Sequence, residues 1–143
     1  MTTAEAKAVP VFGEITLEDM RKNELLAAEV MKRVKEVCAH SKGRYTVTEI
    51  ADGLTRGTYT IWGVLLPPSD LKAIIVTAAN NAVLDVVLAG PVVEDFAPFL
   101  PRLYGEARTK RCTRMRLIGP GFFQKHLPEG WRPSVTVYER DLT

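Results

Sequence analysis

The strongest cluster of chemically active side chains is a basic stretch that runs from Arg102 to Arg116 and contains one acid, Glu106. Its basic residues are Arg102, Arg108, Lys110, Arg111, Arg114 and Arg116. Guanidinium and ammonium groups bind carboxylates and phosphates, so the stretch could contact an acidic partner, a phosphate group or nucleic acid. The other interpretation is the basic end of a helix, favoured by the helix dipole, followed by a strand with an exposed arginine face. The formal net charge of +2 does not by itself favour nucleic acid.

Cysteine and histidine are too sparse to predict a metal centre. Cys38 and Cys112 lie in no Cys-x-x-Cys pair, and the histidines are His40 and His126. A structural zinc ion needs about four such ligands at close spacing. Cys38 continues the apolar stripe of a predicted helix, so we expect it to be a buried small hydrophobe. Two cysteines without an evident partner suit a reducing cytosol or a particle assembled there.

Length and composition favour one folded domain. The 143 residues are 46% hydrophobic and 25% charged, which excludes a disordered chain, a collagen-like repeat and a coiled-coil rod. No apolar run approaches the roughly 18–20 residues of a membrane span. We expect no secretory signal, because no basic segment followed by an apolar core stands at the N-terminus. We expect residues 1–15 to form a tail with an edge strand, and residues 16–143 to form a single domain.

Helices must position the charged groups, and capping signals and apolar periodicity predict where they lie. Thr46 and Glu49 form a Ser/Thr-x-x-Glu capping box at the start of one short helix. A longer amphipathic helix precedes it and is broken near Asn23. Because proline is tolerated only in the first helical turn, a later helix is expected to begin near Pro98. The predicted helices cover about 17–39, 47–56, 98–110 and 122–127.

β-Branched and aromatic runs predict the strands. They cover about 8–12, 58–66, 71–78, 82–88, 113–118 and 134–139. The strand 82–88, the helix after it and the strand 113–118 form a βαβ unit, whose two strands should be parallel. The fold class is therefore α+β, or mixed α/β. We expect a mostly antiparallel sheet of six to seven strands, flanked by about four helices.

Several stretches and their order point to one family. Gly43-Arg44-Tyr45-Thr46 stands at a helix start, the segment from Gly57 to Trp62 at a strand, and the segment from Met115 to Gly121 at a strand and turn. The segment from Gly121 to Arg132 then leads into a final predicted strand. Together with the element order, these stretches resemble the GNAT superfamily of N-acetyltransferases, and most closely the GNAT-like proteins of tailed bacteriophages. The resemblance covers roughly residues 43–142 and rests on order and spacing more than on any single motif.

The resemblance implies a place for acetyl-CoA that this sequence fits poorly. Active members of the family hold the coenzyme between two splayed parallel strands, with its diphosphate on a glycine-rich loop at a helix N-terminus. Here the segment 89–95 has a single glycine. Pro91 lacks an N–H donor, and Glu94 and Asp95 would repel the diphosphate. We therefore expect no bound cofactor, with acetyl-CoA as the alternative.

The resemblance also implies catalytic positions. A carboxylate on the central strand often serves as the general base, and Asp85 is the candidate there. Counting back from Trp131 to the position of the family's general acid gives His126, which could exchange protons near neutral pH. Asp85 could instead be a hydrogen-bonded strand residue, and His126 a partly exposed residue at a helix end. We expect the aromatic side chains to form core rather than a ligand platform.

The missing phosphate loop and the phage-type resemblance lead to one expected function. It is a non-catalytic structural protein of a tailed phage particle, at the head–tail junction or inside the particle. It would contact other virion proteins in multiple copies, without a membrane, after assembly in the host cytoplasm. The alternative is a cytoplasmic N-acetyltransferase that uses acetyl-CoA through an atypical diphosphate loop. A third interpretation is a DNA-contacting module built on the basic stretch.

Overall fold

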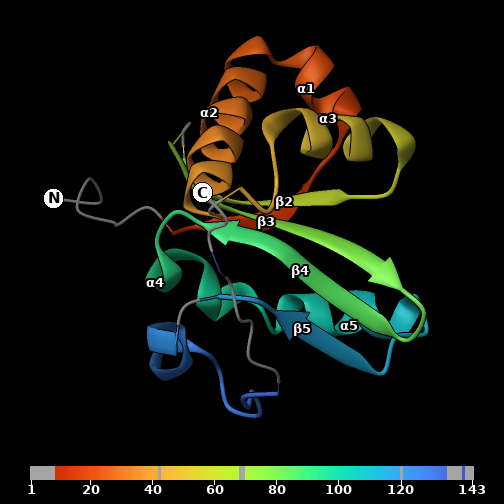
Figure 1. Cartoon of the computed structure of the whole chain (residues 1–143). Helices are drawn as coiled ribbons and strands as arrows, with labels where there is room; N and C mark the ends of the chain where they lie inside the picture. Colours follow the sequence, from red (N-terminus) through yellow and green to blue (C-terminus); the bar gives the residue numbers. More distant parts are fainter. Residues whose placement is uncertain (1–8, 42, 68–69, 120, 135–139, 141–143) are drawn as a thin grey trace, which may run out of the picture.

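β-Branched and apolar runs build one five-stranded sheet in the computed structural model, which describes residues 9–41, 43–67, 70–119, 121–134 and 140 (Figure 1). The strands are β1 (Val11–Ile15), β2 (Thr60–Leu66), β3 (Asp70–Asn80), β4 (Val83–Gly90) and β5 (Arg114–Leu117). They lie in sequence order across the sheet. β1 to β4 pair antiparallel, and β4 pairs with β5 in parallel. The prediction of a mixed, mostly antiparallel sheet with a parallel βαβ pair is confirmed.

Two strand predictions need correction. The described residues contain five strands rather than six or seven. Of the predicted final strand, residues 135–139 lie outside the described residues, and Ser134 is not in a strand. The first strand is shifted from 8–12 to Val11–Ile15 and pairs with β2 from Val11 onward. Pro10 explains the shift, because proline has no N–H to donate to a sheet.

The first three helices follow their local caps. They are α1 (Leu17–Lys22), α2 (Glu24–His40) and α3 (Val47–Arg56). The predicted break near Asn23 is confirmed, since this residue ends α1 and its side chain accepts the Leu26 N–H at 3.1 Å to begin α2. At α3, the Thr46 hydroxyl accepts the Glu49 N–H at 3.1 Å. Gly57 ends the helix in the left-handed region, with φ of 79°.

The helical segment after β4 differs from the prediction of one helix over 98–110. Three short pieces replace it: α4 (Val93–Phe96), the 3₁₀ turn η2 (Ala97–Phe99) and α5 (Arg102–Thr109). Pro98 lies in the first turn of η2, and Pro101 is the N-cap of α5. Each proline removes an N–H donor, so the segment is divided at both positions. The turn η3 (Gly121–His126) follows β5.

The helices cover both faces of the sheet, so β4 lies in the interior (Figure 1). On one face, Val30 and Val34 of α2 pack with Ile50 of α3 against the sheet. On the other face, Phe96 and Leu103 belong to the cluster formed with α4 and α5. Most residues of β3 and β4 face the two cores in alternation, as the period of two requires, and the bulges between paired strands interrupt it.

Both cysteines are buried free thiols. Cys38 lies on the core-facing side of α2, as its place in the apolar stripe predicts, and Cys112 lies just after α5. Burial raises the pKa of the Cys38 thiol. Within the described ranges, no helix is both long enough and apolar enough to cross a membrane.

Candidate active site

The parallel strands β4 and β5 run side by side for only half the length of β4. Val83 to Val86 pair with Arg114 to Leu117. Of the four following residues of β4, Leu88 to Gly90 pair with β3 alone, and Val87 has no partner in the register. β4 also carries a bulge, because Leu88 faces Val76 while Val86 faces Thr77. From Val87 onward, the described part of the chain puts no strand against the outer edge of β4. The pairing of the two strands therefore ends at Val86 and at Leu117, the last residue of β5.

Asp85 lies one residue before the end of this pairing and forms an ion pair with Arg116 of β5. The Arg116 Nε donates to Asp85 Oδ1 at 2.8 Å, and its NH2 nitrogen donates to Oδ2 at 3.1 Å. The Asp85 side chain is 19% exposed, against 49% for Arg116. The hydrogen bond from Arg116, followed by the charge of Asp85, raises the pKa of the guanidinium. The pair holds a charged carboxylate in a fixed position at the junction of the two strands.

Two tyrosines contribute to the surroundings of Asp85 on the α2–α3 face. Burial is the main cause that raises the pKa of Tyr45, and the charges of Tyr59 and Asp85 raise it further. Tyr59 follows α3, and its N–H donates to the Gly53 carbonyl at 3.1 Å. A side chain at Gly53 would collide with the Tyr59 ring, so the glycine lets this ring lie against the helix. The Tyr45 hydroxyl therefore stays protonated at neutral pH.

His126 has a different environment from Asp85, so the structure does not bring these two candidates into one pair. The His126 Nε2 lies 3.2 Å from Glu94 Oε1 in the first turn of α4. The two atoms form an ion pair when the histidine is protonated. The acid that was expected to oppose a diphosphate at this helix therefore has a partner on η3.

Phe123 connects η3 to the rest of the site. Its ring meets the Phe96 ring edge-on, with centroids 5.8 Å apart. A Cβ added to Gly119, two residues after β5, would lie 2.6 Å from the Phe123 ring. Only a glycine permits this approach, so the Phe123 ring closes over the end of β5. Val92 comes two residues after β4, and Ile118 comes directly after β5. These two residues are 45% and 50% exposed.

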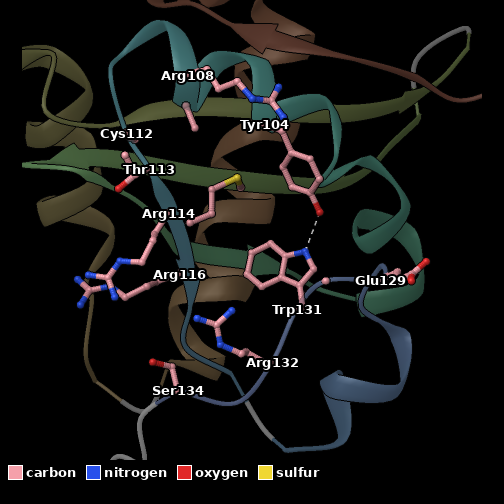
Figure 2. Close-up of a pocket in the computed structure, with 13 residues that line it drawn as sticks. Tyr104, Arg108, Cys112, Thr113, Arg114, Arg116, Glu129, Trp131, Arg132 and Ser134 are labelled. Carbon is pink, nitrogen blue, oxygen red and sulfur yellow. Dashed lines mark hydrogen bonds between the residues drawn. The ribbon is translucent and has the colours of Figure 1, made fainter.

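The residues of the basic stretch lie in different parts of the structure. Arg108, Arg114 and Arg116 line a cavity of about 360 Å³ beside β5 (Figure 2). Arg102 and Arg111 are not among its lining residues. Lys110 instead pairs with Glu106 of α5 at 3.6 Å.

Sequence reasoning missed three residues of this cavity. Arg132 and Trp131 come from the segment after η3, and Tyr104 comes from α5. The Trp131 Nε1 donates to the Tyr104 hydroxyl at 2.8 Å, as Figure 2 shows. Trp131 was expected in the core, and its half-buried ring does pack against one core cluster. The Trp131 ring nitrogen could have indicated a polar contact from the sequence, because a half-buried indole N–H needs an acceptor.

No triplet of His, Cys, Asp or Glu side chains suited to a metal ion occurs among the residues that the structure describes.

No protein-family model and no curated protein matches the sequence. Solved structures match it across nearly the whole chain. An acetyltransferase from Trypanosoma brucei has a TM-score of 0.61 at 14% identity and covers 94% of this chain and 100% of its own. A structure from Clostridium acetobutylicum, described as a predicted acetyltransferase with acetyl-CoA, has a TM-score of 0.56 at 11% identity, with coverages of 94% and 97%.

A third structure is an aminoglycoside acetyltransferase from an uncultured soil metagenomic sample, in complex with sisomicin. Its TM-score is 0.57 at 7% identity, and it covers 92% of this chain and 95% of its own. None of these three is described as a phage protein.

These similarities correct the expected function. The interpretation as a non-catalytic structural protein of a phage particle is wrong, because the chain shares its fold over nearly its whole length with acetyltransferases, including one with acetyl-CoA. That interpretation gave one loop sequence more weight than the architecture of the whole molecule. At these levels of identity the matches establish the architecture, and the chain has the GNAT acetyltransferase fold.

Proposed function

We propose that this protein is an N-acetyltransferase that transfers the acetyl group of acetyl-CoA to an amine. The observation that carries the proposal is that β5 pairs with β4 only as far as Val86 and Leu117, which leaves the end of β4 without a parallel neighbour among the described residues. The pantetheine arm of coenzyme A contains two amide groups, which can hydrogen-bond to a free strand edge. Leu88 to Gly90 offer such an edge, since they pair only with β3 among the described residues.

Two apolar side chains that follow β4 and β5 support placing the pantetheine arm at this edge. Val92 and Ile118 are about half exposed and follow β4 and β5. An apolar entrance suits the methylene groups and the thioester of the pantetheine arm, because it removes their surface from water. The acetyl group would then lie near the junction of the two strands, next to Asp85.

The diphosphate of the coenzyme does not fit the start of α4 in this chain. Pro91 offers no N–H, and the first turn of α4 carries Glu94 and Asp95. A carboxylate at this place repels an anion rather than binding it. We therefore assign the pantetheine arm to the edge of β4 and assign no role to α4 in binding the diphosphate.

The chemistry at the junction is a transfer from sulfur to nitrogen. The lone pair of a neutral amine attacks the thioester carbonyl, a C–N bond forms, and the C–S bond breaks with its electron pair left on sulfur. The amine must lose a proton. We assign its acceptance, directly or through a water molecule, to Asp85, because this carboxylate lies next to the end of the β4–β5 pairing. A backbone N–H on the free edge of β4 can stabilise the charge that develops on the carbonyl oxygen.

Mass spectrometry tests the proposal directly. The protein is incubated with acetyl-CoA and a panel of amines that includes sisomicin, a lysine-containing peptide and a polyamine. At least one amine should gain an acetyl group in proportion to the coenzyme A released. Asp85→Asn should abolish most of this turnover, while Asp70→Asn, at an exposed strand ion pair, should not. Coenzyme A release that never exceeds spontaneous hydrolysis with any acceptor would refute the proposal.

A further inference from the structure

The two faces of β5 carry different kinds of side chain. Met115 and Leu117 pack against the core cluster on the α5 side of the sheet. Arg114 and Arg116 alternate with them, so they are exposed on the opposite face, where Arg116 pairs with Asp85. In Figure 2 the side chains of Arg114 and Arg116 extend to the same side of the strand. The carboxylate that we assign to proton acceptance therefore shares a surface with both arginines.

The charges of these three side chains are not balanced. Asp85 neutralises Arg116 through two hydrogen bonds, at 2.8 and 3.1 Å. The Arg114 side chain has no hydrogen bond and no ion pair to any residue that the structure describes. It stands only two residues from Arg116 on the same face of β5, so its charge acts on the same surface. Arg114 thus leaves an excess of positive charge beside Asp85.

The charged groups on the α3 side of this surface do not remove the excess. Arg44 and Glu49 act on Tyr45 in opposite directions, because the arginine lowers the pKa of the Tyr45 hydroxyl and the glutamate raises it. Their two charges therefore oppose each other near the tyrosine. Asp85 also acts on Tyr45, so all of these groups lie near one region of the α2–α3 face.

The proposed coenzyme site indicates the direction in which an acceptor extends. We assign the pantetheine arm to residues 88–90, which follow Asp85 along β4. Because the arm occupies that end of the strand, the acceptor must extend the other way, toward Val83. Val83 pairs with Arg114, two residues before Arg116. An acceptor with its nitrogen at Asp85 would thus reach Arg114 over about 7 Å, the length of two strand residues.

We propose that the acceptor is a primary amine that carries a carboxylate, and that Arg114 is the residue that selects it. This proposal rests on the acetyl transfer proposed above. The Arg114 guanidinium binds the carboxylate of the acceptor while the amine lies beside Asp85. A polyamine would instead place a second ammonium group next to Arg114, where like charges repel. The same side chain therefore favours anionic acceptors and disfavours cationic ones.

A matched set of amines tests the proposal on the complete protein with acetyl-CoA. δ-Aminovalerate, pentylamine and cadaverine have the same carbon chain, and their far ends are anionic, neutral and cationic. We expect the highest kcat/KM for δ-aminovalerate and the lowest for cadaverine. The advantage of δ-aminovalerate over pentylamine should be about fivefold, the upper end of what an ion pair at an exposed site contributes. It should appear in KM, because the contact is remote from the reacting atoms.

Variants of Arg114 distinguish selection from a structural role. Arg114→Gln should remove the preference for δ-aminovalerate over pentylamine. Arg114→Glu should invert the preference, so that cadaverine becomes a better acceptor than δ-aminovalerate, a gain that loss of structure cannot produce. The control is Arg102→Gln, which removes an exposed arginine of α5 on the other face of the sheet. It should keep the native preference.

Three results would overturn the proposal, and they can be told apart. A kcat/KM for pentylamine or cadaverine that equals or exceeds that for δ-aminovalerate would exclude selection for a carboxylate but leave acetyl transfer standing. An unchanged preference in Arg114→Gln would exclude Arg114 as the selecting residue. Absence of acetyl transfer to every amine would refute the transfer itself, and the acceptor assignment with it.

Discussion

At the scale of single residues, the pairing of Asp85 with Arg116 decides how the carboxylate can act. A carboxylate with two guanidinium hydrogen bonds is held in one orientation, which favours positioning of an amine. Because Arg116 is half exposed, the pair adds little to the stability of the fold, about 0–1 kcal/mol.

Asp85→Asn should therefore separate catalysis from folding. The amide keeps an oxygen that can accept from Arg116 but cannot take a proton. We predict a fall in kcat of about 100-fold or more, with a melting temperature within a few degrees of the native protein. Steady-state kinetics and thermal denaturation measure the two effects. A variant with native kcat would remove Asp85 from the reaction.

Gly119 tests the close approach of Phe123. Its added Cβ would lie 2.6 Å from a ring that already packs against Phe96. We predict that Gly119→Ala lowers the free energy of unfolding by about 1–3 kcal/mol, since the packed ring must move. The matched control is Gly105→Ala in α5, where nothing lies within 4 Å of the added Cβ. It should be neutral or stabilising by up to about 1 kcal/mol, because alanine favours helix. Equal losses in both variants, measured by urea denaturation, would contradict this packing.

The sequence is informative about residue types and less so about the contacts that they make. Residue type and position along the chain are enough to identify Asp85 and the arginines of the basic stretch as candidates. Their partners cannot be identified in this way, because the Asp85–Arg116 contact depends on the register of two strands that are distant in sequence. Arg132 escapes sequence reasoning for a similar reason, since it stands outside the basic stretch and reaches the cavity only through the segment after η3.

At the scale of elements, local signals predict the helices that have complete caps. At α1, the Thr16 hydroxyl accepts the Asp19 N–H at 3.0 Å, and the Asp19 carboxylate accepts the Thr16 N–H at 2.9 Å. The prediction for the segment after β4 is wrong because the beginning of this segment is not set by a side-chain cap. Val93 and Phe96 are buried against the sheet instead, so tertiary packing starts α4 ahead of the prolines.

The capping box at α1 should be visible in the dependence of stability on pH. Hydrogen bonds from Thr16, first from its backbone and then from its side chain, hold the pKa of Asp19 below its ordinary value of 3.8. A carboxyl whose pKa is lower in the folded state stabilises the fold above its unfolded pKa, and this contribution is lost as pH falls through the folded pKa.

We therefore predict that the stability difference between the native protein and Asp19→Asn is constant above about pH 5 and shrinks as pH falls below about 4. Urea denaturation at a series of pH values measures it. Because the other titrating groups are common to both proteins, the difference isolates Asp19. A stability difference that stays the same down to about pH 2 would show that the Asp19 charge does not contribute to folding.

At the scale of the whole molecule, element order predicts the architecture, whereas a single loop gives a misleading indication of function. The mixed sheet and its parallel pair follow from strand and helix periodicity. The acids and prolines after β4 argue against a diphosphate at that helix, but they do not exclude a coenzyme held elsewhere along the strands. The point at which β4 and β5 stop pairing has no local sequence signal, since it depends on the register of two strands that are distant in sequence.

The proposed binding mode predicts an unusual preference between acyl donors. If the pantetheine arm supplies most of the binding, S-acetylpantetheine should have a KM within about tenfold of that of acetyl-CoA, a difference below about 1.4 kcal/mol. Glu94→Gln should change the KM for acetyl-CoA less than about twofold, because the diphosphate is not bound at α4. It should leave S-acetylpantetheine unchanged. Glu24→Gln at the start of α2 is the control. A KM for S-acetylpantetheine that is hundreds of times higher would mean that the nucleotide half dominates binding.

The central claim is that acetyl-CoA binds where the pairing of β4 and β5 ends. Amide NMR of the native protein titrated with acetyl-CoA tests it most directly. We predict the largest chemical-shift changes at Val87 to Ala89 on β4 and at Ile118 and Gly119 after β5, with small changes on α2. Saturating acetyl-CoA that leaves these five amides unmoved, or that shifts only residues far from the two strands, would contradict the proposed site.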